Sequence, residues 1–262
     1  MLKQKILEAL KYKREPMEKR ISASQLGSSV YEILMRIKYG AIESKEINNA
    51  TIGSILHKGL ECIFKNEPMI DVELDLSYKY KEWNITGTAD LYDKETKTIY
   101  DYKFIKKTKV NGSKTITGLI DKLKNNDDDE YFWQLCLLRY LANKNGLEVK
   151  RLVLFTVSPD AGWDYEKKRY IKFDDEVEIP LNYISDEKIE KRIDSLIKEL
   201  NLYVDFENNK ITLPDNCEAK TKYGFLVDNN GKKIPRKCEL YCSYKDVCKL
   251  YRNKNLNLEW RF

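Results

Sequence analysis

Residues 85–104 read ITGTADLYDKETKTIYDYKF, and this stretch decides the fold. Aromatic, aliphatic and β-branched residues fill both of its ends, so it predicts a β-hairpin with a turn at 93–97. Asp90, Asp101 and Lys103 interrupt the two apolar strands. Side chains alternate along a strand, so Asp101 and Lys103 point the same way, about 7 Å apart, and Asp90 can face them from the other strand. Carboxylates gathered beside an ammonium are typical of a divalent-metal site and not of a core.

Four sequence motifs resemble those of a known nuclease family. The G-T-A-D run at 87–90, followed by D-Y-K at 101–103, resembles the PD-(D/E)XK nuclease superfamily. A G-x-x-x-H run at 53–57, in a predicted helix over 49–65, and Gln134, in a predicted helix over 131–143, resemble its RecB-like exonuclease branch. The resemblance implies an α/β fold: a central mixed β-sheet flanked by helices, as in the restriction-endonuclease-like core.

The resemblance also implies roles for individual residues. His57, Asp90 and Asp101 would bind Mg²⁺ or Mn²⁺ together with the backbone carbonyl of Tyr102. Asp101, Lys103 and Gln134 would be catalytic, with Lys103 orienting the attacking water or stabilising charge on the phosphate. Taken alone, His57, the one histidine of the chain, is more simply an isolated and partly buried side chain. The family's tyrosine, four residues after the glutamine, is replaced here by Leu138.

Further elements surround these motifs. Residues 70–80 are expected to form a strand that leads into the hairpin, and the apolar run at 152–158 is expected to complete a β-α-β unit with the second hairpin strand. Ser24 is expected to cap a helix that ends at Gly40, and Ser185 a later helix. The apolar stripe of that later helix predicts core packing, and it consists of Ile189, Ile193, Leu196, Ile197 and Leu200.

The cysteines suggest a second metal site. Four of the six gather near the C-terminus, at Cys217, Cys238, Cys242 and Cys248. Their spacing resembles the iron–sulfur end of the CRISPR-associated exonucleases, which implies a [4Fe-4S] cluster, although Zn²⁺ suits the same thiolates. In that branch an N-terminal cysteine is the usual further ligand, and Ser29 stands at its position, so Cys217 would replace it. Cys62 and Cys136 lie on apolar helical faces and are expected in the core.

Two domains are therefore expected. Residues 1–204 would form the nuclease core with its N-terminal helices, and residues 205–262 the cysteine-rich segment. The chain has 262 residues, 34% of them charged, with a net charge of +5, which permits nucleic acid as a partner without requiring it. No apolar run is long enough for a membrane span, and the N-terminus does not resemble a signal peptide, so we expect a cytoplasmic protein.

The sequence thus predicts a metal-dependent deoxyribonuclease. Exonucleolytic hydrolysis of DNA phosphodiester bonds during end processing, repair or recombination is the expected activity, on single strands or DNA ends. Protein partners in a recombination or CRISPR adaptation complex are a further expectation. The alternative is a catalytically weak or inactive DNA-binding accessory protein that keeps the nuclease fold within a larger complex.

Overall fold

The computed structural model describes most of the chain apart from several segments. It describes residues 16–40, 49–104, 130–157, 162–164, 168–171, 174–179, 185–215, 225–227 and 233–235, with residues 217, 242, 244, 247 and 248. Cys238, one of the four predicted cluster ligands, lies outside the described residues.

The chain divides into two compact units. One, the sheet unit, comprises Lys19–Gly27 and Ile47–Leu196. The other, the cysteine unit, comprises Met1–Glu18, Ser28–Glu46 and Ile197–Phe262. The cysteine unit thus combines N-terminal and C-terminal segments of the chain. The expected domain boundary at residue 204 stays a prediction.

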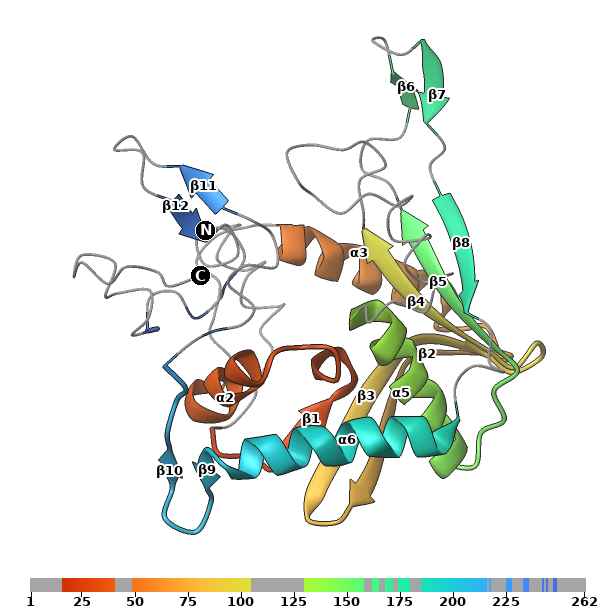
Figure 1. The fold of residues 1–262 in the computed structure, drawn as a ribbon. Helices are drawn as coiled ribbons and strands as arrows, with labels where there is room; N and C mark the ends of the chain where they lie inside the picture. The colour runs from red at the N-terminus through yellow and green to blue at the C-terminus, as the bar shows by residue number, and fades with distance from the viewer. Residues whose placement is uncertain are drawn as a thin grey trace, which may run out of the picture. The chain divides into compact units, whose positions relative to one another are not determined.

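A six-stranded mixed sheet forms the centre of the sheet unit (Figure 1). Its order is β1-β3-β4-β5-β8, with β2 paired to β3. The β1–β3 and β4–β5 pairs are parallel, and the other pairs are antiparallel. The strands are β1 (Arg20–Ser22), β2 (Ile70–Tyr80), β3 (Trp83–Asp93), β4 (Thr98–Phe104), β5 (Arg151–Val157) and β8 (Asp174–Ile179). The predicted α/β class with a central mixed sheet is confirmed.

The predicted hairpin and β-α-β unit are both present. β3 and β4 pair around the turn at 94–97, from Asp93↔Thr98 to Leu91↔Tyr100. Helix α5 (Glu130–Lys144) connects β4 to the parallel strand β5. β5 is covered on both sides, with Leu152, Val153 and Leu154 buried, which is why its sequence is a continuous apolar run.

Helices flank this sheet. Helix α3 (Asn49–Phe64) packs on β2 and β4, and α5 packs across β2, β3, β4 and β5. Helix α6 (Asp186–Asn201) begins after Ser185, whose Oγ accepts the Lys188 N–H at 3.2 Å, so the predicted cap is confirmed. The predicted apolar stripe of α6 is buried as expected. None of the helices in the described residues carries an apolar stretch that could cross a bilayer.

Shorter elements complete the described parts of the chain. A 3₁₀ turn, η1 (Ala23–Gln25), follows β1, and α2 (Val30–Tyr39) lies in the cysteine unit. Three two-stranded sheets pair β6 (Gly162–Asp164) with β7 (Arg169–Ile171), β9 (Val204–Asp205) with β10 (Lys210–Ile211), and β11 (Phe225–Val227) with β12 (Lys233–Pro235).

The expected helix start at Ser24 is wrong. Arg20–Ser22 pairs with β3 as a parallel strand, so the chain is still extended just before Ser24. The helix begins later, at Val30, and its N-cap is Ser29, whose side chain accepts a hydrogen bond from the Glu32 N–H. The expected end is confirmed, because Gly40 adopts a left-handed φ of 66° and its N–H bonds to Arg36 O.

Only one of the two cysteines expected in the core is buried. Cys136 of α5 is fully buried, and burial raises the pKa of its thiol. Cys62 of α3 is exposed, so that prediction is wrong. α3 carries apolar residues on more than one side, and Ile55, Leu56 and Ile63 are exposed as Cys62 is.

Candidate functional site

The sheet divides at Asp90. β2 pairs with β3 along the length of β3, so β4 and β1 share the other edge of β3. β4 pairs with residues 91–93 of β3 and β1 with residues 84–86. Asp90 lies between these two pairings, where β4 leaves β3. Its Oδ2 accepts the Tyr102 N–H at 2.6 Å, so a side chain joins the two strands where the ladder has stopped.

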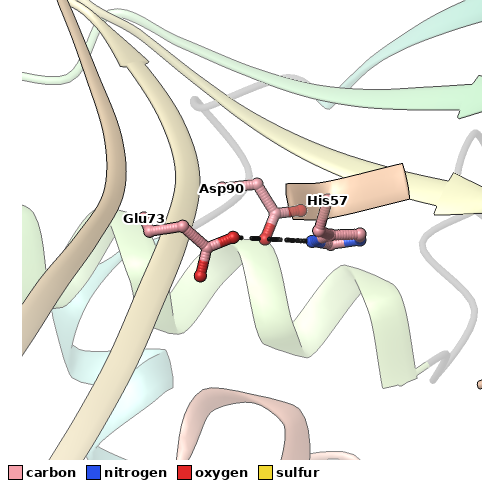
Figure 2. A group of neighbouring side chains, drawn as sticks. All are labelled: His57, Glu73 and Asp90. Carbon is pink, nitrogen blue, oxygen red and sulfur yellow. Dashed lines mark ion pairs between the residues drawn. The ribbon is translucent and has the colours of Figure 1, made fainter. Parts of the chain in front are cut away.

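Two further side chains approach Asp90 from α3 and β2. His57 of α3 places Nδ1 at 3.3 Å from Asp90 Oδ1 and at 3.8 Å from Glu73 Oε1 (Figure 2). One ligand atom from each of these three residues lies within 4.8 Å of the other two. Figure 2 shows the imidazole and the two carboxylates pointing toward one another. Sequence analysis singled out His57 and Asp90 but missed Glu73.

A second group forms on β4 around Asp101, which faces Asp90 in the continued β3–β4 register. This residue is completely buried. Gln134 of α5 donates a hydrogen bond from Nε2 to Asp101 Oδ1 at 2.7 Å, and the Lys103 ammonium contacts Oδ2. The same ammonium lies 5.2 Å from the centre of the Tyr131 ring, a cation–π contact. The structure therefore brings together Asp101, Lys103 and Gln134, the three residues predicted to be catalytic, and their catalytic roles stay a prediction.

A close helix–sheet contact positions Gln134. A Cβ on Gly87 of β3 would lie 2.6 Å from Leu138 Cδ2 and 3.1 Å from Ala23 Cβ. A larger residue here would force Leu138 to shift, so glycine suits this close approach. Leu138, which stands where the family has tyrosine, thus packs against the sheet one helical turn after Gln134. Tyr140, the nearest tyrosine in sequence, donates its hydroxyl hydrogen to Glu190 of α6 and has no place in this group.

The two groups have opposite electrostatic character. Hydrogen bonds to Asp90 and Glu73 raise the pKa of His57 to about 10, although burial opposes the protonated form. Burial raises the pKa of Asp101 above its ordinary value, and the Lys103 ammonium counteracts that rise. The imidazole is thus held as a cation by carboxylates, whereas the buried carboxylate of Asp101 is held by an ammonium and an amide.

This donor set fits a hard divalent cation. Carboxylate oxygens suit Mg²⁺ and Mn²⁺, and one imidazole shifts the preference toward Mn²⁺. With a neutral imidazole, the three carboxylates of Glu73, Asp90 and Asp101 outnumber the single ammonium of Lys103. A cation would balance this negative charge. Asp101 is not in the tight three-residue group, so its predicted role as a ligand, like that of the Tyr102 carbonyl, stays a prediction.

Three of the predicted cluster cysteines are described, all in the cysteine unit. Cys217, Cys242 and Cys248 pack with Tyr31 and Met35 of α2. Cys248 Sγ lies 3.4 Å from the Tyr31 hydroxyl, and the pKa of Tyr31 is raised by burial first and then by the neighbouring cysteines. Within the described part of the chain, these three sulfurs do not all lie within 4.8 Å of one another. The kind of metal or cluster predicted there stays a prediction.

Comparison with known proteins shows similarity of fold. No protein-family model matches the sequence, and no curated protein does. Among solved structures, the crystal structure of SSO0001 matches with a TM-score of 0.50 at 18% identity, over 95% of this chain and 94% of that one. At this identity the match shows a shared fold.

Two exonucleases are also among the similar structures. An alkaline exonuclease from Laribacter hongkongensis matches with a TM-score of 0.40 at 12% identity, over 76% of this chain and 93% of that one. A phage-related exonuclease from Haemophilus somnus matches with a TM-score of 0.43 at 13% identity, over 71% and 92%.

Proposed function

We propose that this chain is a divalent-metal-dependent nuclease that hydrolyses phosphodiester bonds in DNA. The observation that carries the proposal is the meeting of side chains from four separate elements, His57 of α3, Asp90 of β3, Lys103 of β4 and Gln134 of α5, around the point where β4 leaves β3. A structural role alone does not explain this arrangement, because charged groups in a sheet cost stability unless they are paired.

In the proposed site, His57, Asp90 and Asp101 hold Mg²⁺ or Mn²⁺ with the backbone carbonyl of Tyr102. When bound, such a cation lowers the pKa of a water molecule and polarises a phosphoryl oxygen. Lys103 presents an ammonium, a compact point charge, to the phosphate or to the attacking water. Asp101 and the ring of Tyr131 hold that ammonium in place, and Gln134 holds the carboxylate of Asp101.

The decisive experiment is cleavage of end-labelled DNA with Mn²⁺ by the wild type and two variants. Asp90→Asn keeps an oxygen to accept the Tyr102 N–H but removes the negative charge, and Lys103→Ala removes the ammonium. We expect each to lower the rate about 10²-fold or more. Asp75→Asn is the matched control, because Asp75 lies on β2 and accepts a hydrogen bond from Thr88 at the surface. Full activity in both site variants would refute the proposal.

Finer features of the proposed activity rest on the motifs alone. We propose exonucleolytic digestion of single strands or DNA ends by a cytoplasmic protein of the RecB-like branch, related to the CRISPR-associated enzymes. The pattern of end-labelled products separates digestion from an end from internal cutting. Wild-type protein that binds DNA and Mn²⁺ but cleaves nothing would instead indicate an accessory protein with a nuclease fold.

We further propose that the cysteine unit holds a [4Fe-4S] cluster or Zn²⁺ through Cys217, Cys238, Cys242 and Cys248. The support is the packing of three of these thiols around Tyr31. Such a group would stabilise the fold and take no part in hydrolysis. Iron, sulfide and zinc analysis of anaerobically purified protein distinguishes the two, and a protein with neither would refute this assignment.

A further inference from the structure

Glu73 is a residue of the site that no sequence motif indicates. It lies on β2, in the run IDVELDL, where acidic and apolar residues alternate as on any strand with one exposed face. Its side chain is about one-third exposed, and its Oε1 is 3.8 Å from His57 Nδ1. With His57 and Asp90 it forms the one group of possible metal ligands found among the described residues.

The strand register places Glu73 directly opposite Asp90. β2 and β3 pair at Val72↔Leu91 and again at Leu74↔Ala89, with no pairing between Glu73 and Asp90 themselves. Asp90 therefore has Glu73 across one edge of β3 and, by continuation of the β3–β4 register, Asp101 across the other. Two carboxylates facing each other across a sheet repel, and this position is destabilising unless a positive charge lies between them.

The backbone at Glu73 is also unfavourable for this residue type. Its φ is 49°, in the left-handed region that glutamate rarely adopts and that costs of the order of a kcal/mol. The break in the ladder and the left-handed φ coincide at the one residue of β2 whose carboxylate reaches His57. Lys58, next to His57, pairs with Glu61, so the positive charge within reach of both carboxylates is that of a protonated His57, which a metal cation would replace once the imidazole is neutral.

We propose that Glu73 is a ligand of the divalent cation, in addition to His57 and Asp90. This inference rests on the proposed metal-dependent function and deepens it. A second carboxylate in the tight group supplies a further hard oxygen donor and a further negative charge, and both increase affinity for Mn²⁺. The occupied site would then lie between α3, β2 and β3, beside the buried Asp101 and Lys103.

The test is a direct Mn²⁺ titration of the 262-residue chain, in which electron paramagnetic resonance measures the concentration of free Mn²⁺. We expect Glu73→Gln to weaken the tightest Mn²⁺ site about tenfold or more. Glu61→Gln is the matched control, since Glu61 is a carboxylate of the same neighbourhood that pairs with Lys58, and it should bind as the wild type does. Unchanged affinity in Glu73→Gln would overturn the inference.

A second variant, Glu73→Gly, guards against misfolding as an explanation. Glycine accepts the left-handed φ but loses more entropy on folding, so this variant should unfold within about 2–4 °C of the wild type while binding Mn²⁺ as weakly as Glu73→Gln. Retained affinity in this folded variant would also overturn the inference. Failure of the proposed function has a different signature: wild-type protein that cleaves no DNA, with Mn²⁺ binding that still depends on Glu73. If Asp90→Asn abolishes cleavage and Glu73→Gln leaves Mn²⁺ binding intact, only the role of Glu73 fails.

Discussion

Asp90 and Asp101 occupy facing positions on β3 and β4, yet their surroundings differ in almost every respect. On the α3 side, Asp90 lies close to His57 and Glu73, whose side chains are partly exposed. When the imidazole is neutral, these three side chains together carry a net negative charge. On the α5 side, Asp101 is completely buried and its two oxygens face one ammonium and one amide. The α5 side is therefore balanced within the protein, whereas the α3 side is suited to taking up a cation.

This difference separates stability from binding. When a buried charge loses its partner, nothing compensates its desolvation free energy, whereas water still solvates a partly exposed charge. Substitutions on the α5 side should thus lower the free energy of unfolding most. Substitutions on the α3 side should mainly affect cation affinity.

The largest effect on stability is expected for Lys103→Met. The buried carboxylate of Asp101 loses its ammonium, and breaking such a pair costs about 3–5 kcal/mol. Without Lys103 the pKa of Asp101 rises further, so the loss should be small near pH 4 and grow as the pH rises through the folded-state pKa. Urea unfolding across this pH range, monitored by tryptophan fluorescence, measures it.

A surface lysine provides the control for Lys103→Met. Lys97 pairs with Glu148, both at least one-third exposed, so Lys97→Met should change the free energy of unfolding by less than about 1 kcal/mol. If the two variants lose equal stability, or if the Lys103→Met loss does not depend on pH, the α5 side is not a buried group whose charges balance each other.

The α5 side is also the part that the sequence predicted best, for a physical reason. Alternation along β4 alone places Asp101 and Lys103 on the same side, and the β-α-β connection brings α5 and Gln134 over them. These are local consequences of strand and helix geometry. Cys62 shows the limit of such reasoning. Its apolar helical face was expected to be buried, but the sequence does not say which face of α3 packs on the sheet.

Glu73 was missed because its position depends on pairing between strands and not on its own neighbours. In sequence, Asp71, Glu73 and Asp75 look like one solvated face. The available signal was the tight turn at Lys81 and Glu82, which pairs Tyr80 with Trp83 and thereby sets Glu73 opposite Asp90. Its left-handed φ could not have been predicted, since local propensity opposes it. The prediction of a helix cap at Ser24 was wrong for a similar reason, because the pairing of β1 with β3 keeps the chain extended just before it.

A smaller loss is expected for Gln134→Met. Methionine fills similar space on α5 but leaves Asp101 Oδ1 without the amide donor, a loss of about 1–3 kcal/mol for a buried group. Because Gln134 and Lys103 act on the same carboxylate, the Gln134→Met, Lys103→Met double variant should lose an amount different from the sum of the single losses. Urea unfolding of the four proteins gives this coupling. Strict additivity would show that Asp101 does not join the two side chains.

The smallest effect on stability is expected on the α3 side, for His57→Gln. The imidazole is 28% exposed, so loss of its pairing with Asp90 should cost only about 1 kcal/mol near pH 6 without added metal. The pKa of His57 is raised to about 10 in the folded protein, so its contribution is fully present below the unfolded-state pKa of about 6.5 and disappears as the pH rises through about 10. The thermal unfolding temperatures of wild type and variant, measured at several pH values, should therefore converge at alkaline pH.

Mn²⁺ titration of the same variant should show a large loss of affinity, because a small cost in stability together with a large cost in binding is what distinguishes a cation-binding group from a structural one. A deficit that persists at high pH, or intact Mn²⁺ binding, would show that the α3 side is held together as the α5 side is, by its own charges.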